Sequence, residues 1–269
     1  MSLPQSFAEY GGRYRDICMR REDGILEMTL HSGGDSLMWN DRIHEDLVEA
    51  FYLVGRDPKN RVIILTGAGQ NFCPGPDPDS FHFDGSVPPV GLDHVYIEGK
   101  ELIQNLLNVR VPMIAAVNGK AAAHSELALL CDIVLADETA SFSDPHFRWG
   151  IVPGDGIHIA YLTAFGMNRG RTLMLTGEEI GAKDAHACGA VAEVVPSGEL
   201  LDRAWEIGRR LAAQPILALR YTREVMLREL QRMAQDHLSI GLALEGFASG
   251  YGSWAGSLHS ASSKQAKGE

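Results

Sequence analysis

The stretch from Ala115 to Gly156, AAVNGKAAAHSELALLCDIVLADETASFSDPHFRWGIVPGDG, decides the fold and carries the candidate chemistry. It contains two apolar runs that are typical of buried strands, and a polar interruption with His124, Ser125 and Glu126 separates them. His146 and a PGDG turn follow. Polar groups without partners are costly inside a core, so titratable side chains among buried strands predict a catalytic pocket.

The composition of the 269-residue chain, 45% hydrophobic and 22% charged, is typical of a globular protein with a full hydrophobic core. A net charge of -11 argues against nucleic-acid binding, which needs a basic surface. No apolar run approaches the ~20 residues that span a bilayer, and the N-terminus lacks a signal-peptide core. The cysteines form no CxxC pair. We therefore expect a cytoplasmic protein with reduced thiols that binds neither nucleic acid nor membrane.

Strands alternate with helices over the first two thirds of the chain, which indicates an α/β core. Residues Ile25 to Leu30 alternate like a half-buried strand, whereas three continuous apolar runs predict buried strands at Val62–Thr66, Met113–Val117 and Ile133–Ala136. Helices are expected from Asn40 or Asp41, either of which could cap, to about Val54, and from His94 to Leu107. A loop rich in proline and glycine is expected from Cys73 to about Gly91.

The last quarter of the chain is helical in pattern from about Asp202 to Phe247, with a break at Pro215. We therefore divide the chain into a core at residues 1–201, a C-terminal helical region at 202–248 and a tail at 249–269. The tail is small and polar, a composition that predicts disorder.

Four segments in order, AAVNG, ELALLCDIVLA, IVPGDG and LTGEEIGAKDAHACGAVAEVVP, resemble the crotonase (enoyl-CoA hydratase/isomerase) superfamily. The resemblance covers roughly residues 20 to 245. It implies a spiral of ββα turns followed by C-terminal helices that assemble homotrimers or dimers of trimers. Most members of the superfamily act on acyl-CoA thioesters and stabilise an enolate with two backbone N–H groups.

The chain departs from the thioester pattern in three places. The segment FCPGPD puts Pro76, which has no amide hydrogen, at the first oxyanion-donor position. Ala122, Ala123 and His124 replace the glycine triplet that supplies the second donor. One hydratase glutamate is kept as Glu126, but His146 stands where the other is expected. Losing one such donor typically costs about 3 kcal/mol of transition-state stabilisation, so a thioester hydratase is disfavoured.

These substitutions, together with SLMW before Asn40 and LALEG around Glu245, resemble the 6-oxocamphor hydrolase group of β-diketone hydrolases. That resemblance implies retro-Claisen cleavage of a C–C bond in a cyclic or bicyclic 1,3-diketone that carries no CoA. The product is a keto acid and no cofactor takes part. An acyl-CoA hydratase or thioesterase is the alternative within the same fold. A non-catalytic scaffold or RNA binder is the alternative outside catalysis, and the acidic charge disfavours RNA.

The resemblance assigns His146 as the base that activates water, with Asp155 on its other ring nitrogen. The glycine-rich turn between them lets the chain reverse over nine residues. Spacing alone favours Asp155 as the cap of a helix that starts near Ile157, and the resemblance favours the pocket role.

His124 and Trp39 are assigned to the substrate carbonyl, because side-chain donors must replace the missing backbone donor. His124 could instead cap the following helix or be a bonded core histidine, and Trp39 could be a large core residue. Glu245 could lie on a solvated helix face or point at a histidine in the pocket, and Glu126 has a supporting role. The remaining histidines lack metal spacing such as HExxH, so no metal site is predicted, and they are interpreted as surface or structural: His31, His44, His82, His94, His158, His186 and His237.

Overall fold

The structure, a computed structural model, describes residues 6–79 and 89–249, with the side chains of 89–92 left out. The predicted tail beyond residue 249 and the middle of the predicted loop from Cys73 to Gly91 therefore lie outside the described residues. Helix α3 (Pro89–Leu107) starts five residues before the predicted His94. Its first residue is a proline, which lacks the N–H that the first turn of a helix leaves unpaired.

A six-stranded sheet forms the centre of the fold, in the order β1-β2-β4-β6-β8-β11. Only the β1–β2 pair is antiparallel, and the other four pairs are parallel. The strands are β1 (Ile17–Glu22), β2 (Ile25–Leu30), β4 (Val62–Gly67), β6 (Met113–Val117), β8 (Ile133–Asp137) and β11 (Glu193–Val195). The three continuous apolar runs of the sequence are β4, β6 and most of β8.

After each of β2, β4, β6 and β8, the chain makes a short strand and then a helix, which is the spiral of ββα turns. The short strands are β3 (Met38–Trp39), β5 (Gly75–Pro76), β7 (Lys120–Ala121), β9 (Ser141–Phe142) and β10 (Ile180–Gly181). They pair as β3–β5 and as β7–β9–β10, and a bridge between Cys73 and Ala121 links the two sets. The helices are α2 (Asp41–Arg56), α3, α4 (Glu126–Leu129) and α5 (Ile157–Ala164). The mixed α/β architecture that the resemblance implied is thus confirmed.

Helix α2 shows how the sequence determines where a helix starts and which of its faces is buried. The Asn40 side chain accepts a hydrogen bond of 3.0 Å from the N–H of Ile43, so Asn40 rather than Asp41 is the cap. The predicted apolar face is buried throughout: Ile43, Leu47, Ala50, Phe51 and Val54. It packs with α3 against one face of the sheet, and α8 (Leu200–Ala212) covers the other face.

Strand β2 differs from the expectation of a half-buried strand. Five of its six residues are buried, because β2 lies between β1 and β4 with α8 over its second face. The buried polar position, Glu27, accepts hydrogen bonds from Arg20 at 2.7 Å and from the Trp205 indole at 2.6 Å. A charged side chain in this strand therefore marks a buried polar contact and not a solvent face.

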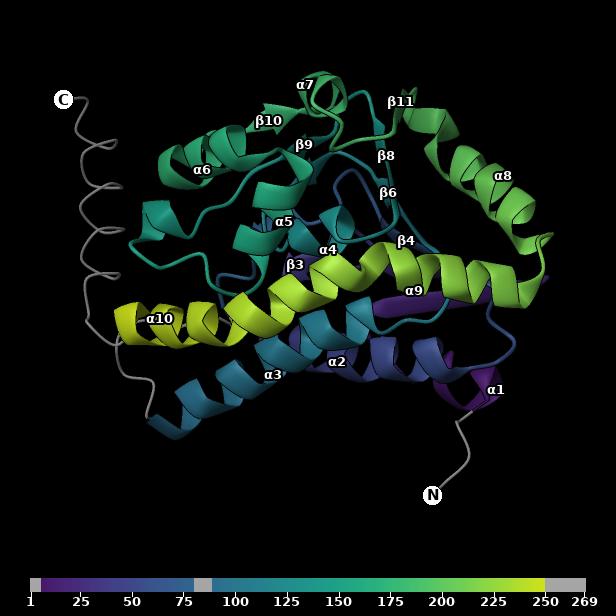
Figure 1. Cartoon of the computed structure of the whole chain (residues 1–269), viewed down its shortest axis with the longest axis horizontal. Coiled ribbons are helices and arrows are strands. Elements are labelled where there is room, and N and C mark those ends of the chain that lie inside the picture. The colour runs from purple at the N-terminus through teal and green to yellow at the C-terminus, as the bar shows by residue number, and fades with distance from the viewer. Residues whose placement is uncertain (1–5, 80–88, 250–269) are drawn as a thin grey trace.

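The C-terminal part of the chain is helical. After α6 (Met167–Thr176) and α7 (Ala182–Ala187) come α8, α9 (Ile216–Met233) and α10 (Ser239–Ser249), and the predicted break at Pro215 separates α8 from α9. The boundary proposed at residues 201/202 falls in the first turn of α8. A π-helical turn, Ala234–Leu238, joins α9 to α10, and the two form one long arm beside α3 (Figure 1).

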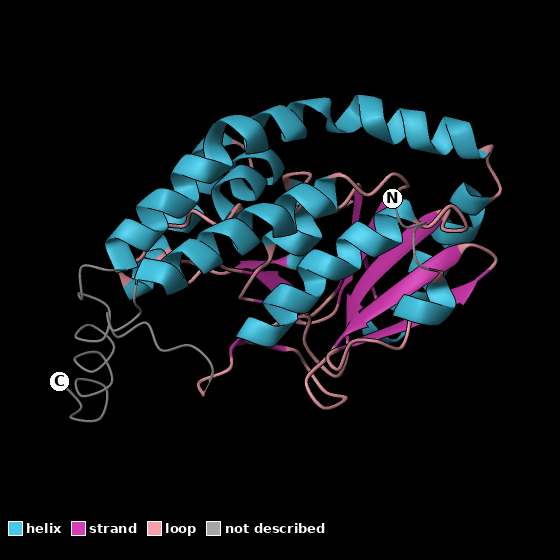
Figure 2. Cartoon of the chain, turned by 90° about the horizontal axis from the view of Figure 1, so that it is seen from below, coloured by secondary structure: helices cyan, strands magenta, loops and turns pink. Residues whose placement is uncertain are grey.

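Figure 2 shows how the helices gather over the sheet. A short helix, α1 (Phe7–Tyr10), precedes the sheet, and 3-10 turns occur at Phe147–Trp149 and Ser197–Glu199. Among the described residues, no helix combines the length and the apolar character needed to cross a membrane.

Candidate active site

His146 is held by the acid that stands two residues before it. After β9 the chain turns through Ser143-Asp144-Pro145, and the His146 Nδ1 then lies 2.6 Å from the Asp144 Oδ1; the Asp144 side chain is buried and that of His146 is 13% exposed. This is a charge-assisted hydrogen bond of short length. With Nδ1–H donated to Asp144, Nε2 is the ring nitrogen that can exchange a proton with a ligand.

The turn around Asp155 brings that carboxylate to both predicted histidines. Its Oδ2 lies 3.5 Å from the His146 Nε2 and 3.6 Å from the His124 Nδ1. Its Oδ1 accepts a 3.3 Å bond from the N–H of Ile157, at the start of α5. Asp155 is therefore a pocket carboxylate that also bonds the first N–H of α5, although Gly156 and not Asp155 is the N-cap residue. The prediction that Asp155 sits on the orienting nitrogen of His146 is wrong, because Asp144 occupies Nδ1 and Asp155 faces Nε2.

Glu245 reaches the same histidine from α10. Its Oε1 is 3.7 Å from the His146 Nε2, and its side chain is only 15% exposed, so it does not lie on a solvated face. One helical turn earlier, Gly241 contacts Gly154 of the PGDG turn so closely that a Cβ on either glycine would overlap the backbone of the other. Because neither glycine has a side chain, α10 packs directly against the turn, and Glu245 lies in the pocket.

His124 occupies a strained backbone position at the centre of the site. Its φ of 49° lies in the left-handed region, which a non-glycine residue adopts only when its surroundings hold it there. Its Nδ1 is 2.7 Å from the Oε1 of the fully buried Glu126, and its ring stacks on Trp39 with centroids 3.6 Å apart. His124 does not cap α4, since Ser125 is the residue at that position.

Trp39 brings an unused hydrogen-bond donor to the pocket. The residue is 2% exposed, and its Nε1 is buried without a hydrogen-bond partner among the described residues. His44 packs edge-on against Trp39 at 5.8 Å and lies 6.2 Å from the His124 ring. A buried indole N–H normally has a partner, so this one is suited to a bound ligand.

Two carboxylates of the site, Asp155 and Glu245, have pKa values that are shifted in opposite directions. Burial alone would lower the pKa of His146, but Asp155, Asp144 and Glu245 outweigh it and raise that pKa well above 6.5. Burial raises the pKa of Asp155, yet His146 and His124 bring it below its usual value. Burial and then Asp155 raise the pKa of Glu245 to about 8. At neutral pH the site thus holds an imidazolium, an ionised Asp155 and a protonated Glu245.

Three of the backbone positions that match the oxyanion donors of thioester enzymes have no free N–H. Pro76 lies in β5 opposite Trp39 and has no N–H to offer. The N–H groups of Ala122 and Ala123 both donate to the carbonyl oxygen of Cys73, at 2.8 and 3.2 Å. Pro76, Ala122 and Ala123 therefore offer no free N–H to a substrate oxygen, and the Trp39 indole is a side-chain donor that can take their place.

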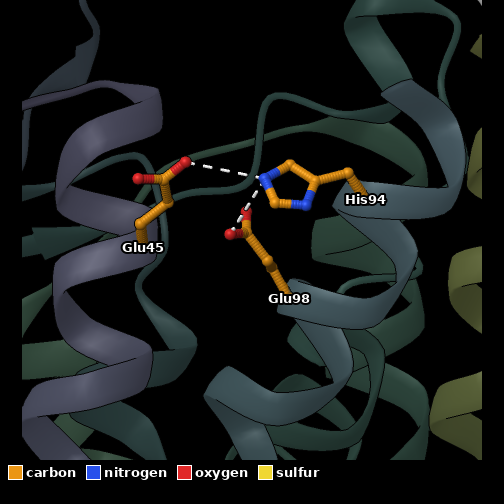
Figure 3. Close-up of side chains that lie close together, drawn as sticks. All are labelled: Glu45, His94 and Glu98. Atoms are coloured by element: carbon orange, nitrogen blue, oxygen red, sulfur yellow. Dashed lines mark ion pairs between the residues drawn. The ribbon is translucent and has the colours of Figure 1, made fainter. Parts of the chain in front are cut away.

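Three sets of side chains in the described part of the chain have ligand atoms within 4.8 Å of one another, close enough to share a metal ion. They are His124, Glu126 and Asp155; His146, Asp155 and Glu245; and Glu45, His94 and Glu98 (Figure 3). None has a sequence spacing that would reveal it. The first two belong to the pocket described above, whose groups are already paired with one another.

The sequence reasoning missed three residues of this region: Asp144, His44 and His158. The signal for Asp144 was present, because an Asp-Pro pair starts a turn and brings the carboxylate beside the residue that follows the proline. His158, on α5, faces Asp155, and burial lowers its pKa. His44 and His158 were interpreted as surface or structural, and no spacing distinguishes them.

Comparison with known proteins identifies the family. The enoyl-CoA hydratase/isomerase family matches residues 20–245. A solved structure of a β-diketone hydrolase from the cyanobacterium Anabaena sp. PCC 7120, bound to (S)-3-oxocyclohexyl acetic acid, is 43% identical with a TM-score of 0.87. The match covers 90% of this chain and 97% of that one.

Two curated relatives from Escherichia coli (strain K12) are CoA enzymes. The 1,2-epoxyphenylacetyl-CoA isomerase is 34% identical over 74% of this chain and 76% of its own length. The 2,3-dehydroadipyl-CoA hydratase is 30% identical over 86% and 87%. The chain therefore belongs to the enoyl-CoA hydratase/isomerase family, the crotonase superfamily.

Proposed function

We propose that this protein is a β-diketone hydrolase that cleaves a C–C bond of a non-CoA 1,3-diketone by a retro-Claisen reaction. The observation that carries the proposal is the pair formed by His146 and Asp144, which Asp155 links to His124. The Trp39 indole stacks on His124, and its N–H has no hydrogen-bond partner among the described residues. The His146–Asp144 pair is a base with a fixed tautomer, and the indole offers a side-chain donor where the matching backbone positions have no free N–H. The 43% identity to a β-diketone hydrolase supports the same reaction.

In the first step, the Nε2 of neutral His146 takes a proton from water as the water oxygen attacks one carbonyl carbon. Asp144 stabilises the imidazolium that forms. Since the pKa of His146 is raised, the neutral base is the minor form at neutral pH. The Asp155 and Glu245 oxygens near Nε2, at 3.5 and 3.7 Å, are the groups that would hold the attacking water.

In the second step, the tetrahedral intermediate collapses, the C–C bond breaks and its electron pair passes to the enolate of the second carbonyl. The Trp39 N–H and the Nε2–H of His124 bind the oxygen of the attacked carbonyl. Burial raises the pKa of Glu126, and its protonated carboxyl donates to the Nδ1 of His124, so that the ring carries its own proton on Nε2. The proton that His146 took up returns to the α-carbon, and we assign Glu245 as the acid that relays it, because it is protonated at neutral pH. When the diketone is cyclic, the ring opens and the single product is a keto acid. Because the second carbonyl accepts the electrons, this reaction calls for no cofactor.

An acyl-CoA hydratase or thioesterase is the second candidate, and the curated CoA relatives favour it. The buried Glu126 matches one of the two hydratase glutamates, but it is bonded to His124. Pro76 and His146 stand against this candidate for the reasons given above.

We also propose that the small-molecule diketone is the chain's main partner besides copies of itself. The superfamily resemblance implies homotrimers or dimers of trimers. On α9, Leu217, Tyr221 and Val225 form an apolar row at four-residue spacing and are 57, 60 and 76% exposed. A second copy of the chain is the occupant we assign to this row.

The proposed function is tested by an ultraviolet assay with bicyclic, monocyclic and linear 1,3-diketones, with crotonyl-CoA in parallel. We expect loss of diketone absorbance and formation of a keto acid, without hydration of the thioester. Turnover should fall to background in a folded His146→Ala variant. Hydration of crotonyl-CoA with untouched diketones would refute the proposal in favour of the second candidate.

A further inference from the structure

A histidine–carboxylate cluster at the surface continues into the pocket. On α3, the His94 Nε2 lies 3.1 Å from the Glu98 Oε1, and it lies 3.5 Å from the Glu45 Oε1 on α2 (Figure 3). Glu45 and His94 are exposed, whereas the Glu98 side chain is only 17% exposed. Glu98 is thus the inner member of the cluster.

The second oxygen of Glu98 points away from His94 to a different histidine. Glu98 Oε2 is 3.4 Å from the Nδ1 of His44, which is itself only 14% exposed. The His44 ring contacts Trp39 and lies near His124, the two residues proposed to bind the carbonyl. One carboxylate therefore joins an exposed histidine on one side to a histidine at the active site on the other.

We propose that Glu98 is a positioning residue of the active site, which accepts the Nδ1–H of His44 and thereby fixes the tautomer and the ring orientation of that histidine. This inference rests on the proposed function, because it gives His44 a task in the pocket where the carbonyl binds. With Nδ1–H committed to Glu98, Nε2 is the His44 nitrogen available to the substrate or to the neighbouring rings.

The physical reason is the same as for Asp144 and His146. A carboxylate accepts only, so a histidine beside it places its N–H on the facing nitrogen. Glutamate is long and loses rotamer freedom when it is held in one place. The contact of its other oxygen with His94 holds the carboxylate in the bridging orientation, so the surface histidine supports the inner contact.

The inference is tested by comparing Glu98→Gln with Glu45→Gln. Both substitutions remove one carboxylate of the same cluster and preserve its size, but only Glu98 touches His44. We expect Glu98→Gln to lower kcat/KM about 10- to 100-fold, the range found when a carboxylate that orients a functional histidine is removed. Glu45→Gln should stay within about twofold, as surface ion pairs contribute little.

A double variant shows whether Glu98 acts through His44. If it does, His44→Gln/Glu98→Gln should be no slower than His44→Gln alone. Multiplicative losses in the double variant would overturn the inference, and so would wild-type kcat/KM in folded Glu98→Gln.

A readout without turnover separates this inference from the proposed function. With histidine-selective ¹⁵N labelling and His44 assigned through His44→Gln, NMR should show the Nδ1 of His44 protonated in the wild type. In Glu98→Gln that signal should change, and in Glu45→Gln it should not. Unchanged His44 signals in Glu98→Gln would refute the positioning role. A protein that leaves every diketone untouched, but shows the expected signals, would refute the proposed function alone.

Discussion

Replacing Asp144 with asparagine isolates the carboxylate that holds the proposed base. The substitution keeps the size of the side chain and removes the charge from a partly buried 2.6 Å hydrogen bond. Bonds of this kind contribute about 1.5–3 kcal/mol. Each ~1.4 kcal/mol corresponds to a tenfold change in rate, so kcat/KM should fall about 10- to 200-fold. The loss is smaller than the ~10⁴-fold of a triad aspartate, because Asp155 and Glu245 remain beside the same ring.

The assay is diketone consumption under kcat/KM conditions, with thermal unfolding of each variant as the control for folding. Asp155→Asn serves as the matched variant, since it removes a carboxylate from the Nε2 side of His146 and leaves the Nδ1 bond in place. NMR of His146 should show a change of tautomer in Asp144→Asn and none in Asp155→Asn. A folded Asp144→Asn protein with kcat/KM within about twofold of the wild type would refute the assignment of Asp144.

Three further predictions follow from the site and its surroundings. In a plot of kcat/KM against pH, the rising limb should have an apparent pKa above 6.5. The base must be neutral, and its carboxylate neighbours raise the pKa of His146. A rising limb at or below pH 6.5 would contradict this prediction. Trp39→Phe keeps the stack on His124 and removes the N–H, so kcat/KM should drop roughly tenfold, and equal rates would show that the donor is unused. Light scattering should find trimers or hexamers. Val225→Arg introduces a charge into the apolar row of α9 and should yield smaller species if that row is the interface. An unchanged mass would place the interface elsewhere.

Local patterns predicted the fold well because each depends on a short stretch of chain. The cap at Asn40, the buried face of α2 and the apolar strands β4 and β6 follow from neighbouring residues. The burial of strand β2 was harder to predict, because its second face is covered by α8, more than 170 residues later in the chain. The Trp205 indole of α8 donates a hydrogen bond to Glu27 of β2.

The sequence predicted residues that the structure brings together in the candidate site, but not how they pair. Motifs indicated His146 and Asp155, but which nitrogen each carboxylate faces depends on the Asp144-Pro145 turn in three dimensions. The place of His44 depends on the packing of α2 beside Trp39, and no spacing in the sequence encodes that contact.

The π-helical turn between α9 and α10 sets the rotation of α10, and this rotation determines whether Glu245 points into the pocket. A π turn has one more residue than an α turn, and each residue rotates a helix by about 100°. Deleting one residue within Ala234–Leu238 would turn α10 about its axis, so Gly241 would leave Gly154 and Glu245 would leave His146. A change in the length of this turn would therefore remove the protonated Glu245 from the pocket, although no residue of the pocket is substituted. Relatives with a different residue count between α9 and α10 would have to supply this acid from another position.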